Sequence, residues 1–260
     1  MLLHQIVVCS VPDVARLNLG EVSVLKVRIK FRKYGVLKFI GHLDVMRFFQ
    51  KLMRRAEIPI AFSGGYSPHM IMSFASPLGI GLTSDGEYVD IELVEPISSH
   101  EAVRRMNEAM GVEGMEIVSF RQISEEKKAT GMAIVAAADY LVNVRTGALP
   151  ENWETRFREF YAQKEIRIVK QTKRSEQEVD IRPMIYDVEV REDGLFLKLA
   201  AGSVQNLKPD LVMEAFMRYA AIEEEEIAFA FHRLEMYADV GIDGKRDLVP
   251  LESLGTEISE

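Results

Sequence analysis

Apolar and basic residues alternate along residues 25–31, which is the pattern of a β-strand with one buried face and one basic face. From Gly41 to about Ala56 the apolar positions recur every three or four residues, which predicts an amphipathic helix. Glycine and proline interrupt residues 60–74, so we expect short strands around a loop there. Alternation returns at residues 88–93 and predicts a further strand.

A second helix and a closing strand complete the first pattern. Ser98 and Glu101 form a capping box, in which a hydroxyl and a carboxylate satisfy free amide groups at a helix start. The helix should end before Gly111, and residues 115–120 follow as a strand. The order strand, helix, strand, strand, helix, strand is that of the split βαβ, or ferredoxin-like, arrangement.

The same order of elements recurs in the second half of the chain, without a repeat at the level of residues. Strands are expected at residues 140–144, 166–169, 179–190, 195–199 and 227–231, and helices at residues 153–161 and 209–219. Asp193-Gly194 is typical of a hairpin turn, and Pro209 suits the first turn of a helix. We therefore predict an α+β fold class with two ferredoxin-like (split βαβ) halves and antiparallel sheets.

Five segments result from these patterns. They are an N-terminal extension (residues 1–23), a first ferredoxin-like half (24–123), a linker (124–138), a second ferredoxin-like half (139–237) and a C-terminal tail (238–260). The linker is first polar and then rich in small residues. The tail is polar, and we expect it to be loosely held.

Composition is ordinary for a globular protein, with 48% hydrophobic and 28% charged residues among 260. No apolar run approaches the roughly 18 residues that span a bilayer, so no membrane association is expected. The apolar start of the chain lacks the preceding Lys or Arg of a signal peptide. Cys9 is the only cysteine, which excludes an intramolecular disulfide and fits a reducing, cytoplasmic compartment.

Charge is unevenly spread along the chain. Residues 24–60 contain ten basic and two acidic residues, a local charge of +8 in a chain of net charge −8, so the remainder carries −16. A basic element in an acidic protein indicates a local anion-binding face. The alternative, held at even weight, is a basic surface that pairs with the acidic remainder.

The start of the first helix is one candidate site. With Gly41 as N-cap, Asp44 occupies the third helical position, where a carboxylate interacts well with free amides. The functional alternative makes Asp44 a general base or an anion-positioning partner of His42. Candidate anion-binding side chains recur on a second face of this helix: Arg47, Lys51 and Arg54.

A loop at residues 62–69 is a second candidate. Its glycines allow positive φ or close approach of a ligand, and loops of this makeup on a rigid scaffold often bind ligands. A Gly-Gly turn is also common in plain hairpins. The candidate ligand-binding residues of this loop are Ser63, Gly64, Gly65, Tyr66, Pro68 and His69.

Two acidic residues follow on the next strand. Glu87 and Asp90 are three apart, so they should face opposite sides of the strand and are not a carboxylate pair. Both are candidates for ligand binding, although an ion pair with a basic face is favoured over catalysis. The spacing of His42, Asp44 and His69 does not require a metal, and we predict no metal site.

The second half offers two further candidates. Arg182 can hold a phosphate or carboxylate through paired hydrogen bonds, with Asp180 beside it. Lys208 lies at a helix start, where anions bind, and Asn206 precedes it. The equally weighted alternative is a surface pair between Asp180 and Arg182, with Asn206 as a cap.

Several of these segments resemble the radical SAM-linked protein family, over about residues 24–237. Residues 39–47 resemble its opening F-I-S-H-L-D-x-x-R, and residues 62–78 resemble its Y-S-x-G-F-N-P-H and S-F-A-x-P-L elements. Further resemblances are residues 87–90 to E-Y-x-D, residues 179–183 to x-D-I-R-P, and residues 206–209 to a Lys/Arg-Pro element. Gly41 replaces a usual Ser, and Met70-Ile71 replaces a usual Pro-Lys, which removes one charge from the loop.

Members of that family occur beside, or fused to, a radical SAM enzyme. The resemblance therefore implies a radical SAM enzyme as partner, and this partner would carry an iron–sulfur cluster and S-adenosylmethionine. No cofactor is expected in this chain, because it lacks the three cysteines that such a cluster requires.

Three hypotheses follow. The favoured one is a partner protein that binds or presents an anionic substrate, for which RNA is a candidate, to a radical SAM enzyme. The second is an RNA-modifying enzyme, because two ferredoxin-like halves around a cleft resemble some pseudouridine synthases in architecture. Asp44 would then be catalytic, with Tyr66 and Arg182 as partners. The third is a non-catalytic interaction scaffold. A shared site requires Asp44, His69 and Arg182 to line one pocket.

Overall fold

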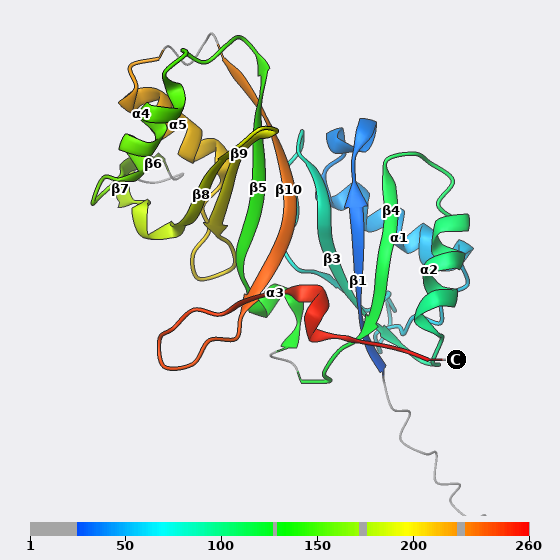
Figure 1. Ribbon diagram of the computed structural model, residues 1–260. Helices are drawn as coiled ribbons and strands as arrows, with labels where there is room; N and C mark the ends of the chain where they lie inside the picture. The colour runs from blue at the N-terminus through cyan, green and yellow to red at the C-terminus, as the bar shows by residue number, and fades with distance from the viewer. Residues whose placement is uncertain (1–24, 127–128, 172–175, 223–226, 260) are drawn as a thin grey trace, which may run out of the picture.

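The computed structural model describes residues 25–126, 129–171, 176–222 and 227–259. One ten-stranded sheet runs through the molecule in the order β12-β4-β1-β3-β10-β5-β9-β8, with β2 paired to β3 and β11 to β10 (Figure 1). Nearly all of the pairing is antiparallel, and the helices are few and short. The predicted α+β class is confirmed.

The first half supplies β1 (Leu25–Lys33), η1 (Gly35–Phe39), α1 (His42–Arg55), β2 (Met72–Phe74), β3 (Thr83–Leu93), α2 (Ser99–Glu108) and β4 (Met115–Gln122). β1 lies between β3 and β4. Val27 and Ile29 on one side of β1 are fully buried against α1 and α2, whose own buried residues include Phe49 and Met106. The spacing of apolar residues therefore positions both helices on one face of these strands.

The second half supplies β5 (Val135–Thr146), α4 (Trp153–Tyr161), β6 (Arg167–Gln171), β7 (Glu176–Asp180), η3 (Arg182–Met184), β8 (Ile185–Arg191), β9 (Gly194–Ala200), α5 (Pro209–Tyr219) and β10 (Ala228–Asp239). Residues 179–190, predicted as one strand, are divided by η3, because Pro183 has no N–H for a strand ladder. β6 and β7 pair only with each other, and Phe157, Phe160 and Phe216 fill the core under α4 and α5.

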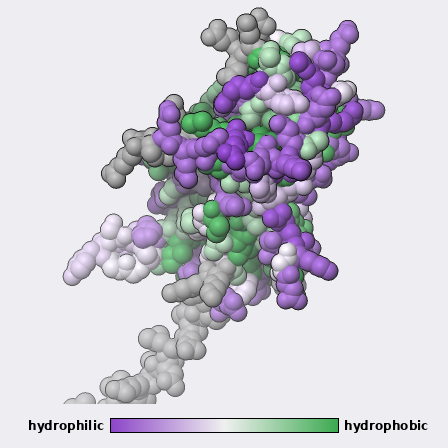
Figure 2. Space-filling model, turned by 90° about the vertical axis from the view of Figure 1, so that its left-hand side faces the viewer, coloured by the Kyte–Doolittle hydropathy of each residue, from purple (hydrophilic) through white to green (hydrophobic). Residues whose placement is uncertain are grey.

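The two halves join through a short parallel pairing, in which His232 and Arg233 of β10 lie beside Thr83 and Ser84 of β3. Arg233 on β10 reaches Glu87, which shares a side of the sheet with the α1-facing Phe31. α1 and α5 therefore cover the same face of the continuous sheet. Figure 2 shows the surface of the second half. Apolar residues form several small patches on this surface, and polar residues lie between them.

The last residues of the chain cross back to the first half. They form β11 (Leu248–Pro250), η5 (Leu251–Leu254) and β12 (Thr256–Glu257), and β12 pairs with β4. Leu251 is fully buried. The expectation of a loosely held tail is wrong, because this apolar turn and the strand pairing anchor the tail.

The predicted linker also contributes structure. α3 (Gly131–Ile134) precedes β5, which begins at Val135 and already includes the buried Ala137 and Ala138. Small residues in this segment fit a crowded strand interior, where we expected only a connection.

The basic side of β1 is largely paired with acidic side chains, which favours the second of the two alternatives, a basic surface that pairs with the acidic remainder. Arg28 is only 2% exposed and forms a two-fold hydrogen-bonded ion pair with Asp90, at 2.8 and 2.9 Å. Lys30 contacts Glu235 at 2.7 Å and Glu252 at 3.0 Å. Acidic residues from β3, β10 and η5 thus neutralise this side of the strand.

The Ser98 half of the predicted capping box is present at α2, whereas the Glu101 carboxylate accepts from Arg104 and Arg105. The Ser98 cap gives a stability prediction. The Ser98 hydroxyl accepts a hydrogen bond from the Glu101 backbone N–H at 3.3 Å. Replacing Ser98 with alanine should lower the free energy of unfolding by about 1 kcal/mol, because this amide loses its partner. Urea denaturation measures the effect, with Ser203→Ala in an exposed loop as the control. Equal stability of both variants would contradict the capping role.

Among the described residues, no helix has the length and apolar character needed to cross a membrane.

Candidate functional site

A cleft of about 290 Å³ opens on the helical face where the two halves meet. The first half contributes the turn that follows β2, and the second half contributes β5, β10 and the approach to α5. The lining residues are Ser76, Pro77, Gly79, Ile80, Leu82, Tyr140, Asn206, Lys208, Pro209, Asp210, Phe231 and Arg233. Seams between structural units are common positions for ligand sites.

Arg233 is the buried charge at this cleft. Its side chain is 4% exposed, its Nε lies 3.4 Å from Glu87 Oε1, and its Nη1 donates to the Ser76 carbonyl at 2.9 Å. The guanidinium lies 5.8 Å from the centre of the Tyr140 ring. In the described part of the chain, neither Arg233 Nε nor Glu87 Oε1 has a hydrogen-bond partner. Arg233 Nε therefore faces the Glu87 carboxylate, and the Ser76 carbonyl holds the other end of the guanidinium at the wall of the cleft.

Glu87 lies beneath the cleft and is 4% exposed. Burial raises the pKa of its carboxyl above the ordinary 4.5, while Arg233, Ser84 and Lys33 act in the opposite direction. Lys33 is also buried, which lowers its pKa, and its Nζ donates to the Ile40 carbonyl at 3.0 Å. These groups form a buried charged cluster shared by both halves.

His42 lies in a narrow hollow next to the cleft. This hollow contains Lys33, Phe74 and Glu87 and shares Pro77 with the cleft. The imidazole meets the Phe74 ring edge-on at 5.2 Å, and burial lowers its pKa below 6.5.

The lowered pKa of His42 predicts a pH effect on stability. The imidazole of His42 binds a proton more readily in the unfolded chain than in the folded protein. Its contribution to stability is therefore fully present above pH 6.5 and is lost as the pH falls through the folded-state pKa. His42→Gln should therefore flatten the dependence of stability on pH below neutrality. Thermal unfolding across this range tests the expectation, with the solvent-exposed His100→Gln as a matched control. Identical pH profiles for wild type and His42→Gln would contradict it.

The start of α5 forms another part of the cleft wall. Lys208 is the N-cap residue, Pro209 occupies the first turn, and Asp210 Oδ1 accepts from the Leu211 N–H at 2.9 Å. Of the residues predicted from sequence, Asn206 and Lys208 line the cleft and Glu87 lies beneath it.

The predicted loop at residues 62–69 is an exposed hairpin. A bridge between Phe62 and Met70 closes it, and the Ser63 hydroxyl contacts His69 Nδ1 at 2.8 Å. Gly65 has φ of +97°, which suits glycine. Gly64, Tyr66 and Pro68 are exposed at its tip, outside the cleft.

The polar residues of α1 also lie outside the cleft. Asp44 is exposed and pairs with Arg47 at 3.3 Å. Lys51 and Arg54 are exposed on the same helix, and neither has an ion-pair partner among the described residues. Arg47, Lys51 and Arg54, which were all predicted to bind an anion, therefore remain accessible to solvent.

Three other predicted residues serve structural contacts. Asp90 holds Arg28 and also accepts from the Gly131 N–H at 2.7 Å. Asp180 accepts from the backbone N–H groups of Ile166 and Arg182, at 2.8 and 3.0 Å. Arg182 donates to the Tyr161 carbonyl at 2.9 Å and lies over its ring.

The shared site expected from the sequence required Asp44, His69 and Arg182 to line one pocket. None of these three residues lines the cleft. The second half contributes residues 206–210 and Arg233 instead. Within the described residues, no group of three His, Cys, Asp or Glu side chains is placed to hold a metal ion.

Three residues that line the cleft were not selected from the sequence: Tyr140, Phe231 and Arg233. We ended the last strand at Phe231, whereas β10 continues to Asp239. The alternation of Phe229, Phe231 and Arg233 was the available signal, since residues two apart on a strand share a face.

Comparison with known proteins gives limited results. No curated protein matches the chain. A chain in the crystal structure of a Cbf5-Nop10-Gar1 complex is similar at 14% identity and a TM-score of 0.43, over 81% of this chain. The match covers 48% of the chain in that complex, so the present protein spans about half of its length. A likeness this low assigns no function.

A family model matches residues 26–209, which is well over half of the chain. The chain therefore belongs to the family described as an uncharacterized protein conserved in bacteria, DUF2344.

Proposed function

We propose that this protein binds an anionic substrate, RNA, in the cleft between its halves and presents it to a radical SAM enzyme. The observation that carries the proposal is that a buried arginine, Arg233, and the exposed Lys208 both line one open cleft. A guanidinium in a dry, fixed position binds phosphate well, because its planar donors match the geometry of the oxygens.

RNA is favoured because a second cationic surface is available to a long substrate. Arg47, Lys51 and Arg54 project from α1, and the rest of the basic segment is largely engaged in contacts within the protein. A polyanion can occupy the cleft and this helix face together, whereas a small anion needs only one of them.

The partner enzyme is supported by the resemblance of residues 24–237 to the radical SAM-linked family. With Cys9 as its only cysteine, this chain cannot hold the cluster itself. Chemistry on the bound substrate would therefore come from the partner, and this protein would supply binding and orientation. Copurification of a tagged full chain with a radical SAM enzyme from its source cells tests this part of the proposal.

Binding of tRNA as a function of salt tests the RNA proposal. The triple change Arg47→Glu, Lys51→Glu and Arg54→Glu should weaken binding strongly and reduce the slope of log affinity against log salt by about 2 to 3, because roughly one counterion is released per phosphate contact. The matched control is Arg158→Glu, Arg167→Glu and Arg191→Glu, which changes the same charge on exposed arginines of the second half. No detectable tRNA or ribosomal RNA binding at low salt would overturn the proposal.

One observation favours the alternative, an RNA-modifying enzyme with pseudouridine-synthase-like architecture. The cleft contains a carboxylate, Asp210, together with Tyr140 and Arg233. Asp44, the catalytic candidate from sequence, is exposed beside Arg47. Assay of RNA for isomerised uridine, with Asp210→Asn and Asp44→Ala, decides between the two carboxylates, and absence of turnover in the wild type excludes this alternative.

A further inference from the structure

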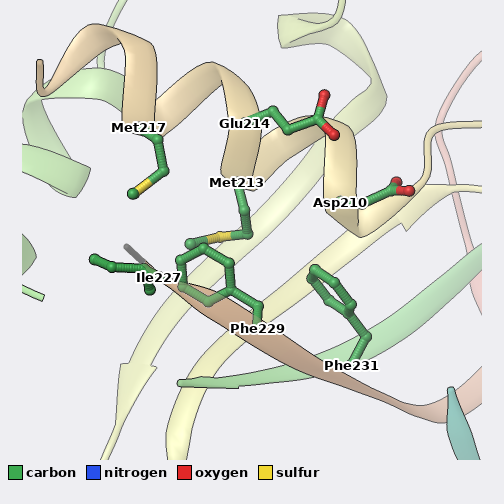
Figure 3. A pocket seen from close by; sticks show the side chains of 7 residues that line it. All are labelled: Asp210, Met213, Glu214, Met217, Ile227, Phe229 and Phe231. Atoms are coloured by element: carbon green, nitrogen blue, oxygen red, sulfur yellow. The ribbon is translucent and has the colours of Figure 1, made fainter. Parts of the chain in front are cut away.

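A second cavity of about 260 Å³ adjoins the cleft, between α5 and β10 (Figure 3). Its lining is formed by Asp210, Met213, Glu214, Met217, Ile227, Phe229 and Phe231. Asp210 and Phe231 line both this cavity and the cleft. The two spaces therefore share part of their lining, and their volumes together lie in the range of about 300–1,000 Å³ that is usual for small-ligand sites.

The second cavity has an aromatic floor. Phe229 and Phe231 are two apart on β10 and point toward α5, with ring centres 6.3 Å apart and ring planes inclined by 44° (Figure 3). Met213 and Met217, both 2% exposed, point down from α5 toward these rings. Both phenylalanines remain partly accessible, so a flat ring can lie against them.

Polarity changes along the combined space. The end between α5 and β10 is lined mainly by aromatic and apolar side chains, together with Glu214. Asp210 stands at the junction, and Lys208 and Arg233 lie on the cleft side. A ligand that matches this order has a flat aromatic ring, an edge that donates a hydrogen bond to a carboxylate, and an anionic group. A fatty acid matches the ends but gives Asp210 nothing to accept from.

We infer that the cavity and the cleft together hold one nucleotide of single-stranded RNA, with its base against Phe229 and Phe231 and its phosphate at Lys208 and Arg233. The base edge donates to Asp210. This inference rests on the proposed function and adds the position of the recognised nucleotide. Stacking on aromatic side chains tolerates every base, and the charged groups fix which end of the nucleotide enters the cleft.

Titration of the full chain with CMP and GMP, followed by calorimetry, tests the inference. Phe231→Leu keeps an apolar side chain but removes the stacking surface, and should weaken nucleotide binding roughly tenfold. Phe231→Tyr should retain it, because the ring remains. Lys208→Gln should weaken CMP and ribose 5-phosphate alike, whereas Phe231→Leu should leave ribose 5-phosphate binding unchanged. Unfolding curves of each variant separate loss of binding from loss of fold.

The possible results separate this inference from the proposed function. RNA binding that is lost in the α1 charge-reversal variant but unchanged by Phe231→Leu and Lys208→Gln would overturn the nucleotide site alone. Nucleotide binding that depends on Phe231, without any binding of longer RNA, would overturn the proposed function and support the site. A change of oligomeric state in Phe231→Leu, with nucleotide binding unaffected, would assign the apolar cavity to a second copy of the chain and overturn the inference.

Discussion

Replacing Asp90 with alanine is expected to destabilise the protein by about 3–5 kcal/mol, because it leaves the Arg28 guanidinium buried without a counter-charge. Asp90 holds Arg28 through both carboxylate oxygens and also accepts from the Gly131 N–H. Arg28 in turn donates to the carbonyls of Ala129 and Leu251. One buried pair therefore links β1, β3, α3 and η5, and its loss should be measurable as a large shift of the urea midpoint.

Asp85→Ala is the matched control on the same strand. Asp85 is 50% exposed at its side chain and lies 3.5 Å from Arg32, which is itself 43% exposed, and 3.1 Å from His232 Nε2. Such a surface pair contributes about 0–1 kcal/mol, so the control should remain close to wild type. If both variants lose the same small amount of stability, Arg28 is not held as a buried ion.

Local patterns predicted the helices well. The spacing of apolar residues at 41–56 and the capping box at Ser98 depend only on neighbours within a turn or two, and α1 and α2 begin where they indicate. The predicted opposite orientation of Glu87 and Asp90 is confirmed, since Glu87 meets Arg233 and Asp90 meets Arg28. Short-range periodicity contains this information because backbone geometry fixes it.

Distant pairing was not predictable in the same way. Alternation along β1 identified a basic side correctly, and pairing with the acidic remainder was one of two alternatives, but the sequence did not indicate which acids cover this side. Lys30 meets Glu235 and Glu252, which are 205 and 222 residues further along the chain. The polar character of the last segment suggested a loose tail, although the same polarity is what neutralises β1.

The residues of the candidate site were predicted only in part, because local signals identify some of them and the others depend on distant pairing. Asn206 and Lys208 were selected from local signals at a helix start, and they line the cleft. Arg182 was selected for its chemistry, yet its guanidinium is occupied by Tyr161 and Ile185. Arg233 was overlooked because no local pattern indicates that β10 will lie beside β3.

Arg233→Met should also destabilise the protein by about 3–5 kcal/mol near neutral pH, because it leaves the Glu87 carboxylate buried without a cation at 3.4 Å. Methionine keeps most of the apolar stem of arginine and fills similar space. The loss of stability in this variant therefore comes mainly from the missing charge and less from an empty space in the core. Chemical denaturation of wild type and variant at a series of pH values provides the measurement.

The pH dependence of this loss identifies its cause. Burial already raises the pKa of Glu87 above 4.5 in the wild type, and removal of Arg233 removes a group that opposes the shift. The folded variant then retains a proton that the unfolded chain releases, so the destabilisation should be small below about pH 4.5 and grow as the pH rises through the folded-state pKa. Glu87→Gln combined with Arg233→Met should recover much of the stability and lose this pH dependence. A loss that is equal at every pH, or unchanged in the double variant, would mean that Arg233 stabilises the seam by packing and not by its charge.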